Sequence, residues 1–198
     1  MKFSAKEIKD LLIAGLMISL AFAILLSGGY NAIISFNYLL LRVFLIAFFS
    51  AGIGFLLHEL MHKYFAQKYG FLAEFRAFYG MLWLAILFSF FGFILAAPGA
   101  VFIQGKISRQ KNGKISLAGP MTNVILAILF LILILTLNVS EIFQSFFSFG
   151  LSINSLLAAF NMIPAMPFDG AKVFRWNKKI YFLTLIFAIG LFVLSFLV

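Results

Sequence analysis

The chain contains no cysteine, and only six of its 198 residues are aspartate or glutamate. The lack of cysteine excludes disulfides and every metal site built on thiolates. Charged residues of both signs make up 11% of the chain, whereas a soluble domain carries about 25%. Hydrophobic residues make up 64% and include 28 phenylalanines. A soluble core cannot absorb this much apolar side chain at this length, so the sequence predicts an integral membrane protein.

Apolar runs long enough to cross a bilayer follow one another along the chain. A membrane helix needs roughly 20 apolar residues, and the candidate spans are residues 11–26, 39–65, 115–137, 149–166 and 180–198. No linker, repeat or low-complexity stretch divides them, so we expect one integral membrane domain over residues 1–198, with its core at about residues 39–175. A cleaved signal peptide is the alternative for residues 11–26, but the run is long for one and no small-x-small cleavage site follows it.

The positive charges predict how the chain crosses the membrane, because Lys and Arg collect on the cytoplasmic side. The apolar stretch 77–103 is too short for two helical spans. If it crosses once, the 15 cations divide between both faces, but if it enters and returns, all except Arg42 lie on the cytoplasmic face. We therefore expect an all-α polytopic membrane protein with about five to six transmembrane helices and a re-entrant element, either helical or a β-hairpin. This topology places the N-terminus in the cytoplasm and explains the net charge of +9 without a nucleic-acid partner.

The HExxH pattern His58-Glu59-Leu60-Met61-His62 lies inside the second candidate span. Residues four apart share one face of a helix, so both imidazoles can bind one metal ion. Glu59 lies beside the first ligand and can act as a base for a water molecule. These are the only two histidines of the chain. A packing role for a buried polar pair is the alternative, but ionisable residues inside a membrane are costly and mark function by default.

A catalytic zinc site needs a third protein ligand, and in this chain an acidic residue must supply it. Such sites use three protein ligands and leave a fourth position for water, and there is no cysteine or further histidine. Asp169 lies at the inner end of another apolar segment, after Pro164 and Pro167, which break the helix. Gly170 permits a positive φ after Asp169, which would help to aim the carboxylate. The alternative is that Asp169-Gly170 forms a turn at the membrane surface. The acidic residues outside the motifs are Glu7, Asp10, Glu74 and Glu141.

Together these motifs resemble the site-2 protease family, which are intramembrane zinc metalloproteases of peptidase family M50. The resemblance covers about residues 54–175. One departure is Ala171, which stands where the family often has a second glycine. The matching segments are the HExxH pattern, Ala118-Gly119-Pro120-Met121-Thr122-Asn123, which is similar to the family's Gly-Pro-x-x-Asn, and Asn161-Met162-Ile163-Pro164-Ala165-Met166-Pro167-Phe168-Asp169-Gly170, which is similar to its Asn-x-x-Pro-x-x-Pro-x-Asp-Gly.

The resemblance implies one zinc ion per chain, bound by His58, His62 and Asp169. It also implies that Glu59 is the catalytic base and that Asn161 lies close to the site, where it donates to the oxyanion. The implied enzyme is an endopeptidase that uses metal-activated water to cut membrane-spanning segments of other proteins. We expect it in the cell membrane, surrounded by lipid, with the mouth of the active site on the cytoplasmic side.

Three alternative functions fit the sequence less well than a protease does. A catalytically inactive pseudoprotease that binds membrane helices would not need Glu59 as a base. A transporter predicts more intramembrane charge along a path and often repeated halves. A structural zinc site predicts four closed ligands. The sequence has one ionisable cluster, no repeat and three good ligands, so it favours the protease.

Overall fold

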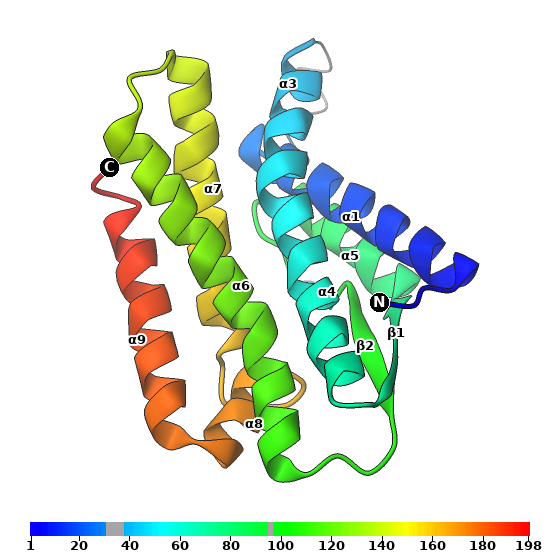
Figure 1. Ribbon diagram of the computed structural model, residues 1–198. Coiled ribbons are helices and arrows are strands. Elements are labelled where there is room, and N and C mark those ends of the chain that lie inside the picture. Colours follow the sequence, from blue (N-terminus) through cyan, green and yellow to red (C-terminus); the bar gives the residue numbers. More distant parts are fainter. Residues whose placement is uncertain (31–37, 95–96) are drawn as a thin grey trace. The chain divides into compact units, whose positions relative to one another are not determined.

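The computed structural model describes residues 1–30, 38–94 and 97–198. Helices dominate this part of the chain, and four of them are long and apolar enough to cross a membrane (Figure 1). The chain is therefore an all-α polytopic membrane protein, as the sequence predicts. The four helical spans are Ala5–Leu26, Leu40–Lys68, Arg109–Thr136 and Glu141–Asn161.

The boundaries of the later spans differ from the predicted ones. Helix α7 covers Glu141–Asn161, whereas hydropathy predicts a span over residues 149–166. It begins earlier because Ser140 and Glu141 start a helix before the apolar run does, and it ends earlier because Pro164 and Pro167 cannot continue it. The last predicted span corresponds to helix α9 (Lys178–Leu194), which has 17 residues and is shorter than the other four.

The described residues form two compact units. The N-terminal unit comprises Lys2–Leu56 and Glu74–Phe102, and the C-terminal unit comprises Leu57–Ala73 and Ile103–Val198. Helix α4 (Ile53–Lys68) runs from the first into the second.

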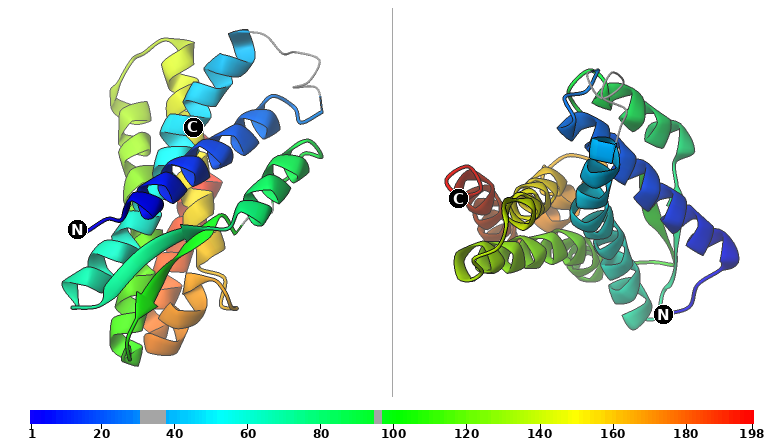
Figure 2. Two further views of the ribbon diagram at one scale, coloured as in Figure 1. Left: turned by 90° about the vertical axis from the view of Figure 1, so that its right-hand side faces the viewer. Right: turned by 90° about the horizontal axis from the view of Figure 1, so that it is seen from above.

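The N-terminal unit is built around helix α1 (Ala5–Leu26). The Ser4 side chain accepts a hydrogen bond from Glu7 N and so caps the start of α1. Helix α1 packs against α3 (Tyr38–Ala47), the following π-helical turn η1 (Phe48–Gly52) and α5 (Tyr79–Ser89), and it lies alongside α5 (Figure 2). Gly52 lets η1 approach α1 closely, because a Cβ there would overlap with Ser19 Oγ.

In the chain, two short strands follow the HExxH helix and precede the Gly-Pro helix. Strands β1 (Leu72–Ala77) and β2 (Gly99–Gln104) pair into a two-stranded sheet, and α5 lies between them in the chain. The sequence predicts this element over residues 77–103, so β2 falls largely inside the prediction and β1 outside it. Hydropathy does not place β1 in the predicted segment, because the strand carries the charged residues Glu74 and Arg76. These two side chains form a salt bridge of 2.7 Å. Residues 95 and 96 of the predicted segment lie outside the described part.

Carboxylates of α1 occupy one edge of β1. Glu7 Oε1 accepts a hydrogen bond of 2.8 Å from Phe75 N, and Asp10 Oδ2 accepts one of 3.3 Å from Ala77 N. Asp10 Oδ1 also accepts a hydrogen bond of 2.6 Å from the Tyr79 hydroxyl. Alternate backbone groups of a strand face opposite edges, so these bonds satisfy the edge of β1 that faces away from β2.

The C-terminal unit is a bundle of the end of α4, α6 (Arg109–Thr136), α7, α8 (Asp169–Trp176) and α9. Ser108 caps α6 and Asn177 caps α9, each through a side-chain oxygen that accepts a backbone N–H. Gly150 lets α7 approach α6, because a Cβ there would overlap with the ring of Phe130. The core between α6, α7 and α9 consists of Val124, Ala127, Phe130, Phe147, Leu151, Ala158, Ala188 and Leu191.

Candidate metal centre

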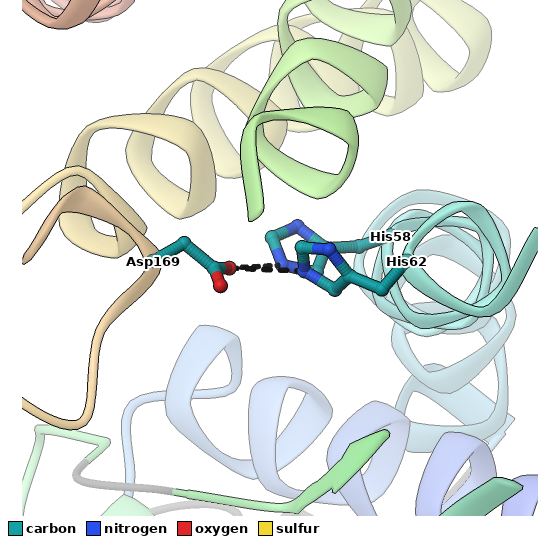
Figure 3. Close-up of side chains that lie close together, drawn as sticks. All are labelled: His58, His62 and Asp169. Carbon is teal, nitrogen blue, oxygen red and sulfur yellow. Dashed lines mark ion pairs between the residues drawn. The ribbon is translucent and has the colours of Figure 1, made fainter. Parts of the chain in front are cut away.

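Two helices bring His58, His62 and Asp169 together within the C-terminal unit. The histidines lie one turn apart on α4, and Asp169 is the first residue of α8 (Figure 3). Asp169 Oδ2 lies 3.4 Å from His58 Nε2 and 2.9 Å from His62 Nε2. The three residues each offer one ligand atom, and these atoms lie within 4.8 Å of one another. They are the predicted zinc ligands.

Oxygen atoms of α6 accept a hydrogen bond from the Nδ1 atom of each imidazole. His62 Nδ1 lies 2.8 Å from the backbone oxygen of Ile115, and His58 Nδ1 lies 2.6 Å from Asn123 Oδ1. Carbonyl oxygens only accept hydrogen bonds, so both Nδ1 atoms carry the hydrogen and donate it. Each ring then turns its Nε2 towards Asp169. Metal-binding histidines are oriented in this way by their second nitrogen.

The Gly-Pro segment of α6 fits directly against the histidines. A Cβ at Gly119 would overlap with the Nε2 atoms of both His62 and His58, so only glycine allows this approach. Pro120 lies inside α6 and has no N–H, so it cannot bond to the backbone oxygen four residues earlier. Asn123 follows Gly119 by one helical turn and therefore faces the same side.

Asp169 is buried and divides its two oxygens between different partners. Oδ2 faces the histidines, and Oδ1 lies 3.4 Å from the Lys172 ammonium. Burial alone would raise the pKa of Asp169, but the nearby His62 and His58 outweigh it and hold that pKa below its usual range. The carboxylate is therefore ionised and can serve as a ligand through Oδ2.

Gly170 does not adopt the positive φ that glycine permits. Among the described residues, the glycines with positive φ are Gly28, Gly29, Gly70, Gly92 and Gly105. Gly170 is instead the second residue of α8, and a Cβ there would overlap with the backbone oxygen of Met162. The glycine is required by the close approach of α8 to the end of α7, which the sequence pattern does not reveal.

The donor set fits a zinc ion. Two imidazole nitrogens and one carboxylate oxygen are the ligand types of catalytic zinc sites, which leave a further position open. Two lone pairs and an anionic oxygen that converge in a buried space are stabilised by a cation between them. The hydrogen bonds at both Nδ1 atoms supply the outer support that such sites use.

The two remaining predicted site residues differ in their surroundings. Glu59 is buried, and among the described residues its carboxylate makes no hydrogen bond or salt bridge. Asn161 is the last residue of α7, and its side-chain nitrogen donates to the backbone oxygen of Leu157 over 2.9 Å. That bond uses one of the two amide hydrogens of Asn161. The structure does not bring Asn161 into a hydrogen bond with the three metal-facing residues.

The fold and the site define a polytopic membrane protein with a His-His-Asp group that can hold a metal ion. A protein of Methanocaldococcus jannaschii named "Putative zinc metalloprotease MJ0611" is 43% identical over 182 residues, which are 91% of this chain and 89% of that protein. A second one from the same organism, "Zinc metalloprotease MJ0392", is 29% identical over 66% of this chain and 33% of its own length. "Putative zinc metalloprotease YwhC" of Bacillus subtilis is 30% identical over 61% of this chain and 64% of its own length. No family model and no solved structure matches the chain. The chain belongs to the zinc metalloproteases.

The site also contains residues whose roles the sequence motifs do not reveal. Asn123 belongs to the Gly-Pro motif, but its bond to His58 depends on the packing of α6 against α4. Asn154 belongs to no motif with a recognisable spacing, although a polar residue inside an apolar span is itself a sign of function. Lys172 follows Asp169 by three residues, so the helical spacing of α8 could have predicted that pair.

Proposed function

We propose that this zinc metalloprotease is a site-2 protease-like endopeptidase that cleaves membrane-spanning segments of other proteins. The observation that carries the proposal is the position of the site on an apolar helix. His58, Glu59 and His62 lie in the span Leu40–Lys68, which is long and apolar enough to cross a membrane. A peptide bond that reaches this site must itself come from an apolar segment. The motif resemblance to the site-2 proteases supports the same substrate class.

The residues of the site can be given roles in peptide hydrolysis. His58, His62 and Asp169 would hold zinc, which when bound polarises a carbonyl group and lowers the pKa of water. Glu59 takes a proton from the attacking water and later donates it to the leaving amine nitrogen. The water oxygen forms the new bond to the carbonyl carbon, and the C–N bond breaks. The second amide hydrogen of Asn161 is available to the carbonyl oxygen as it gains negative charge.

The substrate must be extended where it is cut, because a hydrogen-bonded helix hides its carbonyl groups. An extended segment can pair with the edge of a sheet. Strand β1 is a poor partner, since Glu7 and Asp10 already bond to its outward N–H groups. We therefore assign this pairing to β2, whose outward edge bonds to no side chain among the described residues.

The test compares zinc content and cleavage in the wild type and two variants. Glu59→Gln keeps all three ligands, so it should bind about one zinc per chain and lose at least 100-fold in cleavage rate. Asp169→Ala should lose zinc and activity together. Purified protein is loaded with zinc, and the probes are casein in detergent and a single-span membrane protein in liposomes.

Each result distinguishes the protease from its alternative. Full cleavage by Glu59→Gln would disprove Glu59 as the base. Zinc retained in full by Asp169→Ala would make Asp169 a turn residue. A zinc-loaded wild type that cleaves neither probe would favour the pseudoprotease, and one that cleaves only casein would contradict intramembrane specificity.

A further inference from the structure

A chain of buried amide groups connects His58 to helix α7. Asn123 Nδ2 on α6 donates a hydrogen bond of 3.0 Å to Asn154 Oδ1 on α7. Asn154 Nδ2 in turn donates a bond of 2.8 Å to the backbone oxygen of Gly150. Asn123 and Asn154 are both 0% exposed. A metal-facing imidazole is thus linked, through two side chains, to a helix that supplies no metal ligand.

The backbone oxygen of Gly150 fixes the direction of every bond in this chain. That oxygen can only accept, so the group of Asn154 that faces it must be the NH2 group. The carbonyl oxygen of Asn154 then faces Asn123, so the group of Asn123 that faces it must be the NH2 group, which donates the hydrogen bond. The carbonyl oxygen of Asn123 therefore faces His58 Nδ1. His58 Nδ1 therefore carries a hydrogen and donates it, which leaves Nε2 as the nitrogen that can bind a metal.

Asn123 alone would not enforce this choice. An isolated amide can rotate by half a turn and present NH2 in place of oxygen, which would favour a hydrogen on His58 Nε2 and block that nitrogen as a ligand. Asn154 removes the alternative, because the rotated Asn123 would place its oxygen against the oxygen of Asn154. His62 needs no such support, since Ile115 presents a backbone oxygen that cannot rotate.

We propose that Asn154 is a positioning residue of the metal centre. It acts through Asn123 and holds His58 in the one tautomer that can bind metal through Nε2. The inference rests on the zinc site of the proposed function, and it concerns which nitrogen of His58 is presented to the metal. It also makes the metal affinity sensitive to the position of α7 relative to α6.

The chain offers an unusually direct measurement of this tautomer. It contains only two histidines, so labelling with 15N-histidine gives the signals of His58 and His62 alone. In the zinc-loaded wild type, both rings should show a hydrogen on Nδ1 and a metal-bound Nε2. Asn154→Leu keeps the size of the side chain and removes both amide groups, and it should shift or split the Nδ1–H signal of His58 while that of His62 is unchanged.

Zinc affinity provides the second readout. Loss of an outer-shell hydrogen-bond partner typically weakens metal binding by 10–100-fold, and Asn154→Leu should fall in this range in competition with a chelator. Asn154→Asp keeps an oxygen that accepts from Asn123, so it should bind zinc more tightly than Asn154→Leu. Ser155→Ala is the matched control, because Ser155 is buried next to Asn154 and bonds to Leu151 O and Ser152 O of its own helix. It should behave as the wild type.

The outcomes separate this inference from the proposed function. Wild-type His58 signals and zinc affinity in folded Asn154→Leu would overturn the inference, as would equal loss in Asn154→Leu and Ser155→Ala. Equal weakening by Asn154→Leu and Asn154→Asp would overturn the role of the accepting oxygen. If the wild type shows the expected tautomers but cleaves no peptide bond, the inference stands and the proposed function fails.

Discussion

Gly119 shows how one missing methyl group can determine the chemistry of a site. Glycine at this position lets α6 pass against the metal-facing nitrogens of both histidines, and it places Asn123 one turn further along the same face. A sequence motif of glycine, proline and asparagine thus has a separate physical reason for each residue. Glycine gives the space, proline removes a backbone donor, and asparagine orients a ligand.

Replacing Gly119 by alanine should lower zinc affinity at least tenfold. The added Cβ would overlap with His62 Nε2 and His58 Nε2, so the rings or α6 must shift and the ligand geometry is lost. Zinc content after dialysis against a weak chelator measures the effect. Gly190→Ala on α9 is the control, because a Cβ there meets nothing within 4 Å. Equal zinc content in the two variants would show that the site tolerates the methyl group.

The sequence predicts some of these residues and not others for a clear reason. His58, Glu59 and His62 follow from local helical spacing, and Asp169 follows from the short list of acidic residues in the chain. Asn154 has no local pattern, because its meaning depends on the contact between α6 and α7. Such pairings between distant segments are set by tertiary packing and are not encoded in spacing.

At the scale of elements, the turn between α7 and α8 places Asp169. Pro164 and Pro167 predict that α7 must end, and it does end at Asn161. The sequence does not predict that α8 begins directly at Asp169, nor that it lies so close to the last turn of α7. That approach brings the Cα of Gly170 against the backbone of Met162 and Ile163.

Gly170→Ala should therefore destabilise the protein and displace Asp169. A Cβ at this position would overlap with the backbone oxygen of Met162, and overpacking of this kind costs about 1–3 kcal/mol. We expect a lower thermal unfolding temperature together with weaker zinc binding. Gly80→Ala on α5 serves as the control, since a Cβ there meets nothing within 4 Å. A stable variant with normal zinc content would mean that the turn relaxes at little cost.

The edge of β1 depends on α1 in a way that can also be tested. Asp10→Leu removes the acceptor of Ala77 N and leaves Phe75 N bonded to Glu7. A buried N–H without a partner costs about 1–3 kcal/mol. Amide hydrogen exchange at Ala77 should accelerate at least fivefold, while exchange at Phe75 should change much less. Equal acceleration at both amides would show that α1 detaches as a whole.

At the scale of the whole molecule, the cations of the C-terminal unit collect at one end of its helices. Lys111 at the start of α6 lies over the ring of Tyr69, just after the end of α4, at 5.7 Å. Gly113 in the next turn of α6 contacts Trp176 at the end of α8. The end of α4, the start of α6, α8 and the start of α9 lie at the lower end of this unit in Figure 1. They and the residues just before them carry the remaining cations of the unit, which are Lys63, Lys68, Lys106, Arg109, Lys114, Lys172, Arg175, Lys178 and Lys179. The positive-inside rule predicts that this end faces the cytoplasm.

The absence of cysteine makes the orientation directly measurable. A single cysteine can be introduced at Lys106, between β2 and α6, or at Asn138, between α6 and α7, and both positions are exposed. In intact cells, a membrane-impermeant maleimide should label Asn138→Cys and should label Lys106→Cys only after the membrane is permeabilised. The unmodified chain is the control and should give no signal. Labelling of Lys106→Cys in intact cells would place the cation-rich end outside, and the orientation inferred from the charge distribution would then be wrong.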